Sequence, residues 1–136
     1  MTPRRRARMA AIQTLFELDF QDRPPDDVIG ERLAEVTLTI EGQQFVHDLV
    51  HGVVHHREEI DARIAAAAPQ WPIEQIAHVD KNVLRLAIYE LMFDNSAPAK
   101  VAISEAIELA RLLGSAASPK FVNGVLGAVM ATKEVN

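Results

Sequence analysis

Three histidines recur every four residues in the first half of the chain, at His47, His51 and His55. On a helix this spacing places the imidazoles on one face, where they can bind zinc or another transition metal. The sequence has no cysteine and no HExxH motif, and no clear carboxylate completes a ligand triad. We therefore expect structural histidines, no metal site, and no rise in melting temperature when zinc is added. A metal-responsive helical regulator is the alternative for this histidine row.

The other residues with catalytic potential lack the partners that catalysis requires. Acidic pairs occur at 26–27 and 58–59, but adjacent residues on a helix point in different directions and do not form an acid/base dyad. No serine lies in a GxSxG motif, and no glycine-rich loop of the Walker or dinucleotide type is present. We predict that the protein is not an enzyme and that it binds no cofactor.

Four arginines lie within five positions at the start of the chain, at Arg4, Arg5, Arg6 and Arg8. No acidic residue precedes Glu17, whereas the remainder of the chain is acidic and the net charge is -5. Thr2 and the proline that follows it predict a helix start, and the N-terminal end of a helix already carries partial positive charge. An external anion would relieve this conflict, so the cluster indicates a polyanion such as nucleic acid. An electrostatic tether for an acidic protein surface is the alternative.

Composition indicates one globular domain spanning residues 1–136, with 49% hydrophobic and 24% charged residues. The absence of cysteine fits a reducing compartment, and we expect the protein to be cytoplasmic. No apolar run approaches the roughly 20 residues that cross a bilayer, and the N-terminal segment lacks the features of a secretory signal.

Hydrophobic periodicity predicts an all-α fold of about seven helices. Helices are expected over residues 2–20, over a segment capped by Asp26 and Asp27, and then from about residue 43 after a break at 39–42. Further helices are expected over 58–68, 78–94 and 99–113, with a single turn at 73–76 and a connection at 95–98. Ser118 is expected to cap the last helix, with Pro119 at its first position. In the first helix, Met9, Ile12, Leu15, Phe16 and Phe20 form the expected apolar face.

The segment 78–94 is apolar around much of its circumference, which predicts a central helix. Lys81 and Arg85 lie one turn apart on it, with Asp80 and Glu90 close in sequence. These charges either pair within the helix or form a contact surface for RNA or protein.

Lys120 lies in the first turn of the last helix, beside Phe121 and Asn123. A phosphate could meet the lysine there while a base stacks on the aromatic ring. Core packing is the simpler role for Phe121, because aromatic residues at helical spacing usually fill cores.

Several stretches resemble the NusB family in order and spacing, from residue 4 to about residue 129. The opening segment 4–15 resembles the first NusB helix, 48–61 its middle section, and 79–91 its central helix. The most specific likeness is VAISEAIELA at 101–110 followed by KFVNGVL at 120–126. Chance is a poor explanation for several independent motifs in the same order.

The resemblance implies an all-helical fold of two small bundles and a role in transcription antitermination during ribosomal RNA synthesis. It implies binding to boxA RNA together with NusE, a small-subunit ribosomal protein, and assembly with other Nus factors on RNA polymerase. Carried onto this chain, the RNA-binding residues are Arg4, Arg5, Arg6, Arg8, Gln13 and Phe16, with Lys120, Phe121 and Asn123 as further candidates. Phe16 stands where the family often has tyrosine, so a hydroxyl contact would be lost and stacking retained.

Asp80, with Lys81 and Arg85 on the same helix, would face the protein partner, and an acidic body suits a basic ribosomal protein. The same fold occurs as the RNA-binding domain of certain rRNA cytosine methyltransferases, a function that would require a further segment beyond this sequence. A helical protein-interaction module is the other alternative. The family contains monomers and dimers, so the resemblance is compatible with either a monomer or a homodimer.

Overall fold

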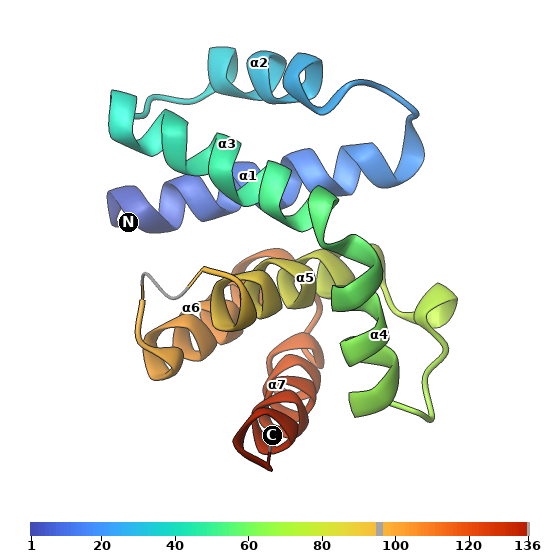
Figure 1. Ribbon diagram of the computed structural model, residues 1–136. Helices are drawn as coiled ribbons and strands as arrows, with labels where there is room; N and C mark the ends of the chain where they lie inside the picture. Colours follow the sequence, from blue (N-terminus) through green and yellow to red (C-terminus); the bar gives the residue numbers. More distant parts are fainter. Residues whose placement is uncertain (95–96, 136) are drawn as a thin grey trace. The chain divides into compact units, whose positions relative to one another are not determined.

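The computed structural model describes residues 1–94 and 97–135, with side chains up to residue 133. The described residues form seven α-helices and one short 3-10 turn, with no strand, which confirms the predicted all-α fold (Figure 1). The expected connection at 95–98 falls partly on residues 95 and 96, which lie outside the described residues. None of the described helices combines the length and apolar character needed to cross a membrane. The elements are α1 (Pro3–Phe20), α2 (Pro25–Glu35), α3 (Ile40–His55), α4 (Arg57–Ala67), η1 (Ile73–Gln75), α5 (His78–Met92), α6 (Ala99–Leu113) and α7 (Ser118–Val135).

Contacts divide the chain into two compact units, Met1–His55 and His56–Asn136. In the first unit, α1 packs against both α2 and α3, which also pack against each other (Figure 1). Alanine, isoleucine and leucine side chains of α1 are buried together with valines of α2 and α3. Small residues at Ala7, Ala10 and Ala11 limit the volume of this stretch of α1, so neighbouring side chains can approach it closely.

In the second unit, α5 packs against α4, α6 and α7. Every α5 residue from Asp80 to Leu91 is buried except Tyr89, including five polar or charged residues. This confirms the central position that the apolar pattern of the segment predicted. Its buried charges need partners within the protein, because an unpaired buried charge is costly.

Three predicted helix starts differ from the structure in detail. Helix α2 begins at Pro25, with Pro24 at the N-cap position and no side-chain cap, so Asp26 and Asp27 occupy the first turn instead of capping it. Proline suits this start because the first helical N–H has no partner to lose, and the two carboxylates complement the helix dipole. Helix α7 begins at Ser118 itself, and the Ser118 hydroxyl accepts from the Ser115 N–H at 2.9 Å instead of capping the following turn.

The start of α3 lies at Ile40, where the sequence predicted a break. The Thr39 Oγ1 accepts a hydrogen bond from the Gly42 N–H at 3.0 Å, and the Gln43 N–H donates to the Thr39 carbonyl at 2.9 Å. Thr39 therefore caps the helix in the ordinary way. The extra turn was missed because Ile40 is 82% exposed and adds nothing to the apolar face.

Candidate nucleic-acid interface

The arginine cluster lies in the first two turns of α1, as predicted. The Thr2 Oγ1 accepts from the Arg5 N–H at 3.2 Å, Pro3 is the first helical residue, and the first turn contains no acidic side chain. Arg4 and Arg6 are exposed, Arg5 is half-buried and Arg8 is buried. Two guanidinium groups are therefore directly available to solvent at a helix end whose dipole favours an anion.

Phe45 of α3 orders two members of this cluster. The Arg4 Cζ lies 3.9 Å from the centroid of the Phe45 ring, and the Arg8 Cζ lies 5.4 Å from it. Both distances are in the range of cation–π contacts, which orient a guanidinium without neutralising its charge. Phe45 therefore links α3 to the positive end of α1. Because the ring already orients Arg4, this side chain loses less conformational entropy when it binds an anion.

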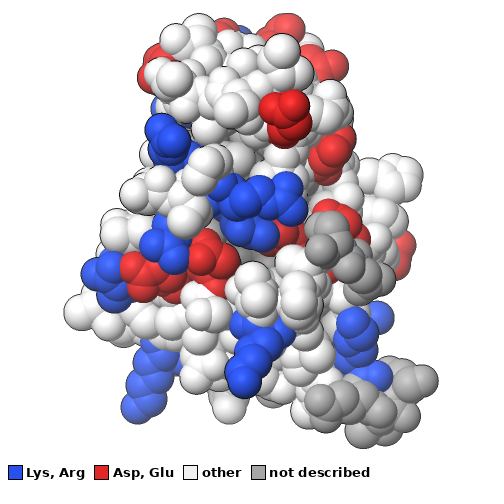
Figure 2. All heavy atoms as spheres, turned by 90° about the vertical axis from the view of Figure 1, so that its left-hand side faces the viewer, with Lys and Arg blue, Asp and Glu red and all other residues white. Residues whose placement is uncertain are grey.

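A hollow of about 220 Å³ lies beside Arg6. Pro3, Arg6 and the segment 37–39 line it, together with Gly42. Figure 2 shows the side of the molecule on which α1 begins, where lysine and arginine side chains gather in clusters with carboxylates beside some of them. A concave surface next to an exposed guanidinium is suited to a flat or anionic group.

Farther along α1, Gln13 is half-buried, whereas Phe16 and Phe20 are exposed. The two phenylalanine rings contact each other, with centroids 5.1 Å apart. Both rings are exposed, although they share the predicted apolar face of α1 with Ile12 and Leu15, which are buried. The helix turns them out of the core, where they present an aromatic surface on which bases can stack.

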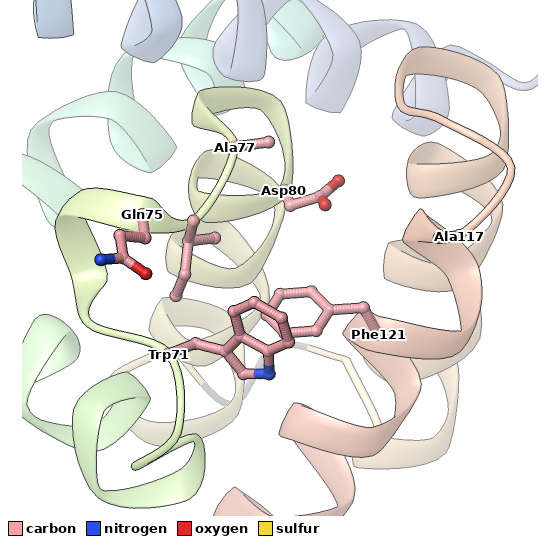
Figure 3. Close-up of a pocket in the computed structure, with 7 residues that line it drawn as sticks. Trp71, Gln75, Ala77, Asp80, Ala117 and Phe121 are labelled. Carbon is pink, nitrogen blue, oxygen red and sulfur yellow. The ribbon is translucent and has the colours of Figure 1, made fainter.

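In the second unit, a pocket of about 220 Å³ lies between η1, α5 and the start of α7 (Figure 3). Trp71 and Phe121 form its aromatic wall, with ring centroids 6.4 Å apart and planes at 86°. Asp80 of α5 also lines the pocket, and its Oδ1 is buried without a hydrogen-bond partner in the part of the chain that the structure describes. An unpaired buried carboxylate oxygen is costly, so a rotation of the Asp80 side chain that brings this oxygen to a donor in the pocket would relieve that cost.

Lys120 and Asn123 are exposed on the same first turns of α7, while Phe121 is half-buried against Trp71. Core packing was the simpler expected role for Phe121. The structure places its ring at the surface of a pocket instead. Lys120, Phe121 and Asn123 lie in the second unit, whereas the arginine cluster lies in the first.

Lys81 and Arg85 are both buried. Arg85 donates from Nε to Asp61 Oδ1 at 2.9 Å and from Nη2 to Asp61 Oδ2 at 3.0 Å, and its Nη1 donates to Asn82 at 3.2 Å. Arg85 therefore pairs with an acid of α4, a partner that the pattern of its own helix did not indicate. This two-point ion pair gives Arg85 a structural role in joining α4 to α5.

The histidine row is split by the structure. His47 and His51 lie beside Asp26 of α2, whereas His55 is not part of that group. The sequence showed no carboxylate for these histidines because Asp26 is far from them along the chain.

Trp71, Phe45 and Asp61 were not identified as functional from the sequence. Trp71 is the only tryptophan, stands between two prolines and is half exposed, which is a usable signal for a surface contact. Phe45 and Asp61 fit an ordinary helical pattern, and only the neighbouring helices reveal their partners.

The sequence matches the NusB family over residues 5–131. Transcription antitermination protein NusB of Roseiflexus castenholzii is 48% identical over 130 residues, covering 94% of this chain and 92% of that protein. Its counterpart in Dehalococcoides mccartyi is 42% identical over 128 residues, covering 94% and 90%.

Solved structures agree with the sequence comparison. T. maritima NusB superimposes with a TM-score of 0.88 at 36% identity, covering 96% of this chain and 92% of that one. A complex of antitermination factors NusB and NusE with double-stranded RNA contains a chain with a TM-score of 0.87 at 28% identity, covering 97% and 98%. The chain therefore belongs to the NusB family, a family of non-enzymatic transcription antitermination factors.

Proposed function

We propose that this protein binds boxA-type RNA together with NusE and joins other Nus factors on RNA polymerase during rRNA transcription in the cytoplasm. The related complex that holds NusB, NusE and RNA supports this proposal. We assign RNA contacts to Arg4, Arg5, Arg6 and Arg8, with Gln13 and Phe16 farther along α1. Lys120, Phe121 and Asn123 are assigned as a second group of RNA contacts.

The observation that carries the RNA assignment is the accumulation of arginines at the N-terminal end of α1 without any acid in the first turn. Such an arrangement destabilises an isolated helix, because like charges and the helix dipole oppose one another. A phosphate would be favoured by both the exposed guanidiniums and the dipole. The contact of Arg4 with Phe45 holds one guanidinium in place without consuming its charge.

The protein partner is assigned to the second unit, around Asp80. The chain outside the arginine cluster is acidic, which favours a basic ribosomal protein. If the Asp80 side chain turns toward the pocket, its unpartnered Oδ1 can accept from a lysine, arginine or backbone N–H of that protein. Lys81 and Arg85 are buried, so we assign them to positioning α5 and assign the direct contact to Asp80 and the pocket that it lines.

The RNA assignment is tested by removing the two exposed arginines in an Arg4→Ala/Arg6→Ala variant. The matched control is Arg57→Ala/Arg111→Ala, which removes two exposed arginines from the second unit. Binding of single-stranded boxA-type RNA is measured by gel shift with and without NusE, over a series of salt concentrations, with an RNA duplex as competitor.

The α1 variant should bind RNA more weakly, and its plot of log affinity against log salt should be shallower by about 1.4 for two lost phosphate contacts on single-stranded RNA. The control variant should retain both the affinity and the slope. Equal losses of RNA affinity in the two variants would show a general effect of net charge. The arginine cluster would then have no specific part in the RNA interface.

A further inference from the structure

Asp26, His47 and His51 bring three metal-ligating groups together on the surface of the first unit. The Asp26 Oδ1 lies 2.6 Å from His51 Nε2 and 3.7 Å from His47 Nδ1. The three donor atoms all lie within 4.8 Å of one another. Two imidazole nitrogens and one carboxylate oxygen form a donor set that zinc accepts in proteins.

The backbone fixes the approach of these three groups. His47 and His51 are one turn apart on α3, and their rings stack with centroids 6.1 Å apart and planes at 9°. Asp26 comes from the first turn of α2, and α2 packs against α3. Each ligand therefore comes from a helix and not from a loop, which leaves side-chain rotation as the means of adjusting the geometry.

We propose that Asp26, His47 and His51 form a binding site for Zn²⁺ or a similar divalent transition ion. Tetrahedral zinc with bonds of about 2.0 Å needs donor atoms about 3.3 Å apart. The pair at 3.7 Å is close to that separation, and the pair at 2.6 Å must open slightly when a metal replaces the hydrogen bond. All three side chains have access to solvent, so water or a group from a binding partner can supply the fourth ligand.

The competing explanation is an ion pair between Asp26 and a protonated His51, without a metal. Mixed imidazole and carboxylate ligands favour zinc, cobalt, nickel or copper over Mg²⁺ and Ca²⁺, which prefer sites built from oxygen. Metal binding and simple pairing therefore differ in a measurable way. The site lies outside the residues assigned to RNA and NusE, and the inference does not depend on that assignment.

The test is titration calorimetry of the tag-free full chain, stripped of metal, with Zn²⁺ in a buffer that does not chelate it. The test variants are Asp26→Asn, His47→Ala and His51→Ala. The control is His55→Ala, which removes a histidine from the same helix outside the cluster. All four positions are solvent-accessible, and circular dichroism verifies that each variant remains helical.

Wild type and His55→Ala should bind one equivalent of Zn²⁺ with the same affinity. Each test variant should bind Zn²⁺ at least about tenfold more weakly. Co²⁺ in place of Zn²⁺ should give a visible absorption band that is lost in the His47→Ala/His51→Ala double variant. Zinc should also raise the melting temperature of the wild type, because an ion that binds only the folded state stabilises it. The sequence alone predicts no rise in melting temperature, because it does not show that Asp26 lies beside the two histidines.

Equal zinc affinity in the wild type and the His47→Ala/His51→Ala variant would overturn the proposal and leave the ion pair. A loss in His55→Ala as large as that in His51→Ala would also overturn it, since binding would then involve histidines in general.

Discussion

Arg85 and Asp61 form a two-point ion pair between α5 and α4, in which the Arg85 side chain is 3% exposed and the Asp61 side chain is 24% exposed. Arg57 lies 3.8 Å from the same carboxylate but is 51% exposed. The same acid therefore has one buried and one solvent-accessible cationic partner, which allows a matched comparison.

We expect Arg85→Met to lower the free energy of unfolding by about 3 kcal/mol, the lower end of the range for breaking a buried pair, because Asp61 retains access to water. Arg57→Met should cost at most about 1 kcal/mol, as for other exposed pairs. Urea unfolding followed by circular dichroism measures both. Similar losses in the two variants would show that burial does not strengthen the Arg85 pair.

Phe45→Leu should weaken RNA binding by about two- to fivefold, which corresponds to the roughly 0.5–1 kcal/mol of a cation–π contact whose guanidinium, that of Arg4, is exposed. Phe45→Tyr should bind normally, since its ring also attracts a guanidinium. Fluorescence anisotropy with labelled boxA-type RNA resolves this difference. If Phe45→Leu binds as tightly as wild type, the ring has no part in presenting Arg4.

Asp80→Ala should lower the affinity for NusE by about tenfold or more, because a hydrogen bond to a charged group contributes about 1.5–3 kcal/mol. Trp71 lines the same pocket and is the only tryptophan, so its fluorescence reports the titration directly. Burial of the indole should shift its emission to shorter wavelength. Glu74→Ala is the control, since Glu74 is exposed on η1 and does not line the pocket. An Asp80→Ala variant with wild-type affinity would exclude this carboxylate from the interface.

Two glycine-to-alanine substitutions should have opposite effects on the stability of the protein. At Gly114 a Cβ would clash with Ser118 Oγ and lie 2.7 Å from Ser118 Cβ, so Gly114→Ala should lower the free energy of unfolding by about 1–3 kcal/mol. At Gly30, within α2, a Cβ meets nothing within 4 Å, and Gly30→Ala should stabilise by about 0.5–1 kcal/mol. Thermal or urea unfolding of both variants gives the comparison. A stabilising Gly114→Ala would show that the segment after α6 rearranges at no cost.

The hydrogen bond from Arg23, aided by its charge, lowers the pKa of the Glu31 carboxyl below its ordinary value. A lowered folded-state pKa means that the pair stabilises the protein above the ordinary carboxyl pKa and that this contribution is lost as pH falls through the lowered pKa. We expect the NMR titration midpoint of Glu31 to rise in Arg23→Gln. Both side chains are accessible to water, so an unchanged midpoint would show that solvent already screens the pair.

The helices themselves could be predicted because their signals are local. Thr2 and Pro3 start α1, Gly114 follows the end of α6, and the continuous apolar pattern of α5 indicates burial. The charge pattern identified the arginine cluster, whose placement at a helix start the structure confirms. The likeness to the NusB family assigned that cluster to RNA.

The pairs that join helices could not be predicted, because periodicity describes one helix at a time. Arg85 and Asp61 are separated by 24 residues, and His51 and Asp26 by 25. The likeness to the NusB family placed Phe16 near the RNA surface, but the apolar pattern of α1 did not. Buried residues occupy so much of the circumference of α1 that hydrophobicity alone does not show which aromatic rings lie outside the core.

The division of the chain near His55 has an evolutionary consequence. The arginine cluster and Phe45 depend on the core of one unit, while Asp80 and Trp71 depend on the core of the other. Under the proposed assignments, natural selection can therefore adjust the affinity for RNA through the arginine cluster without altering the side chains around Asp80. A mutation at Phe121, which is assigned to RNA and also lines the Asp80 pocket, would change both affinities together.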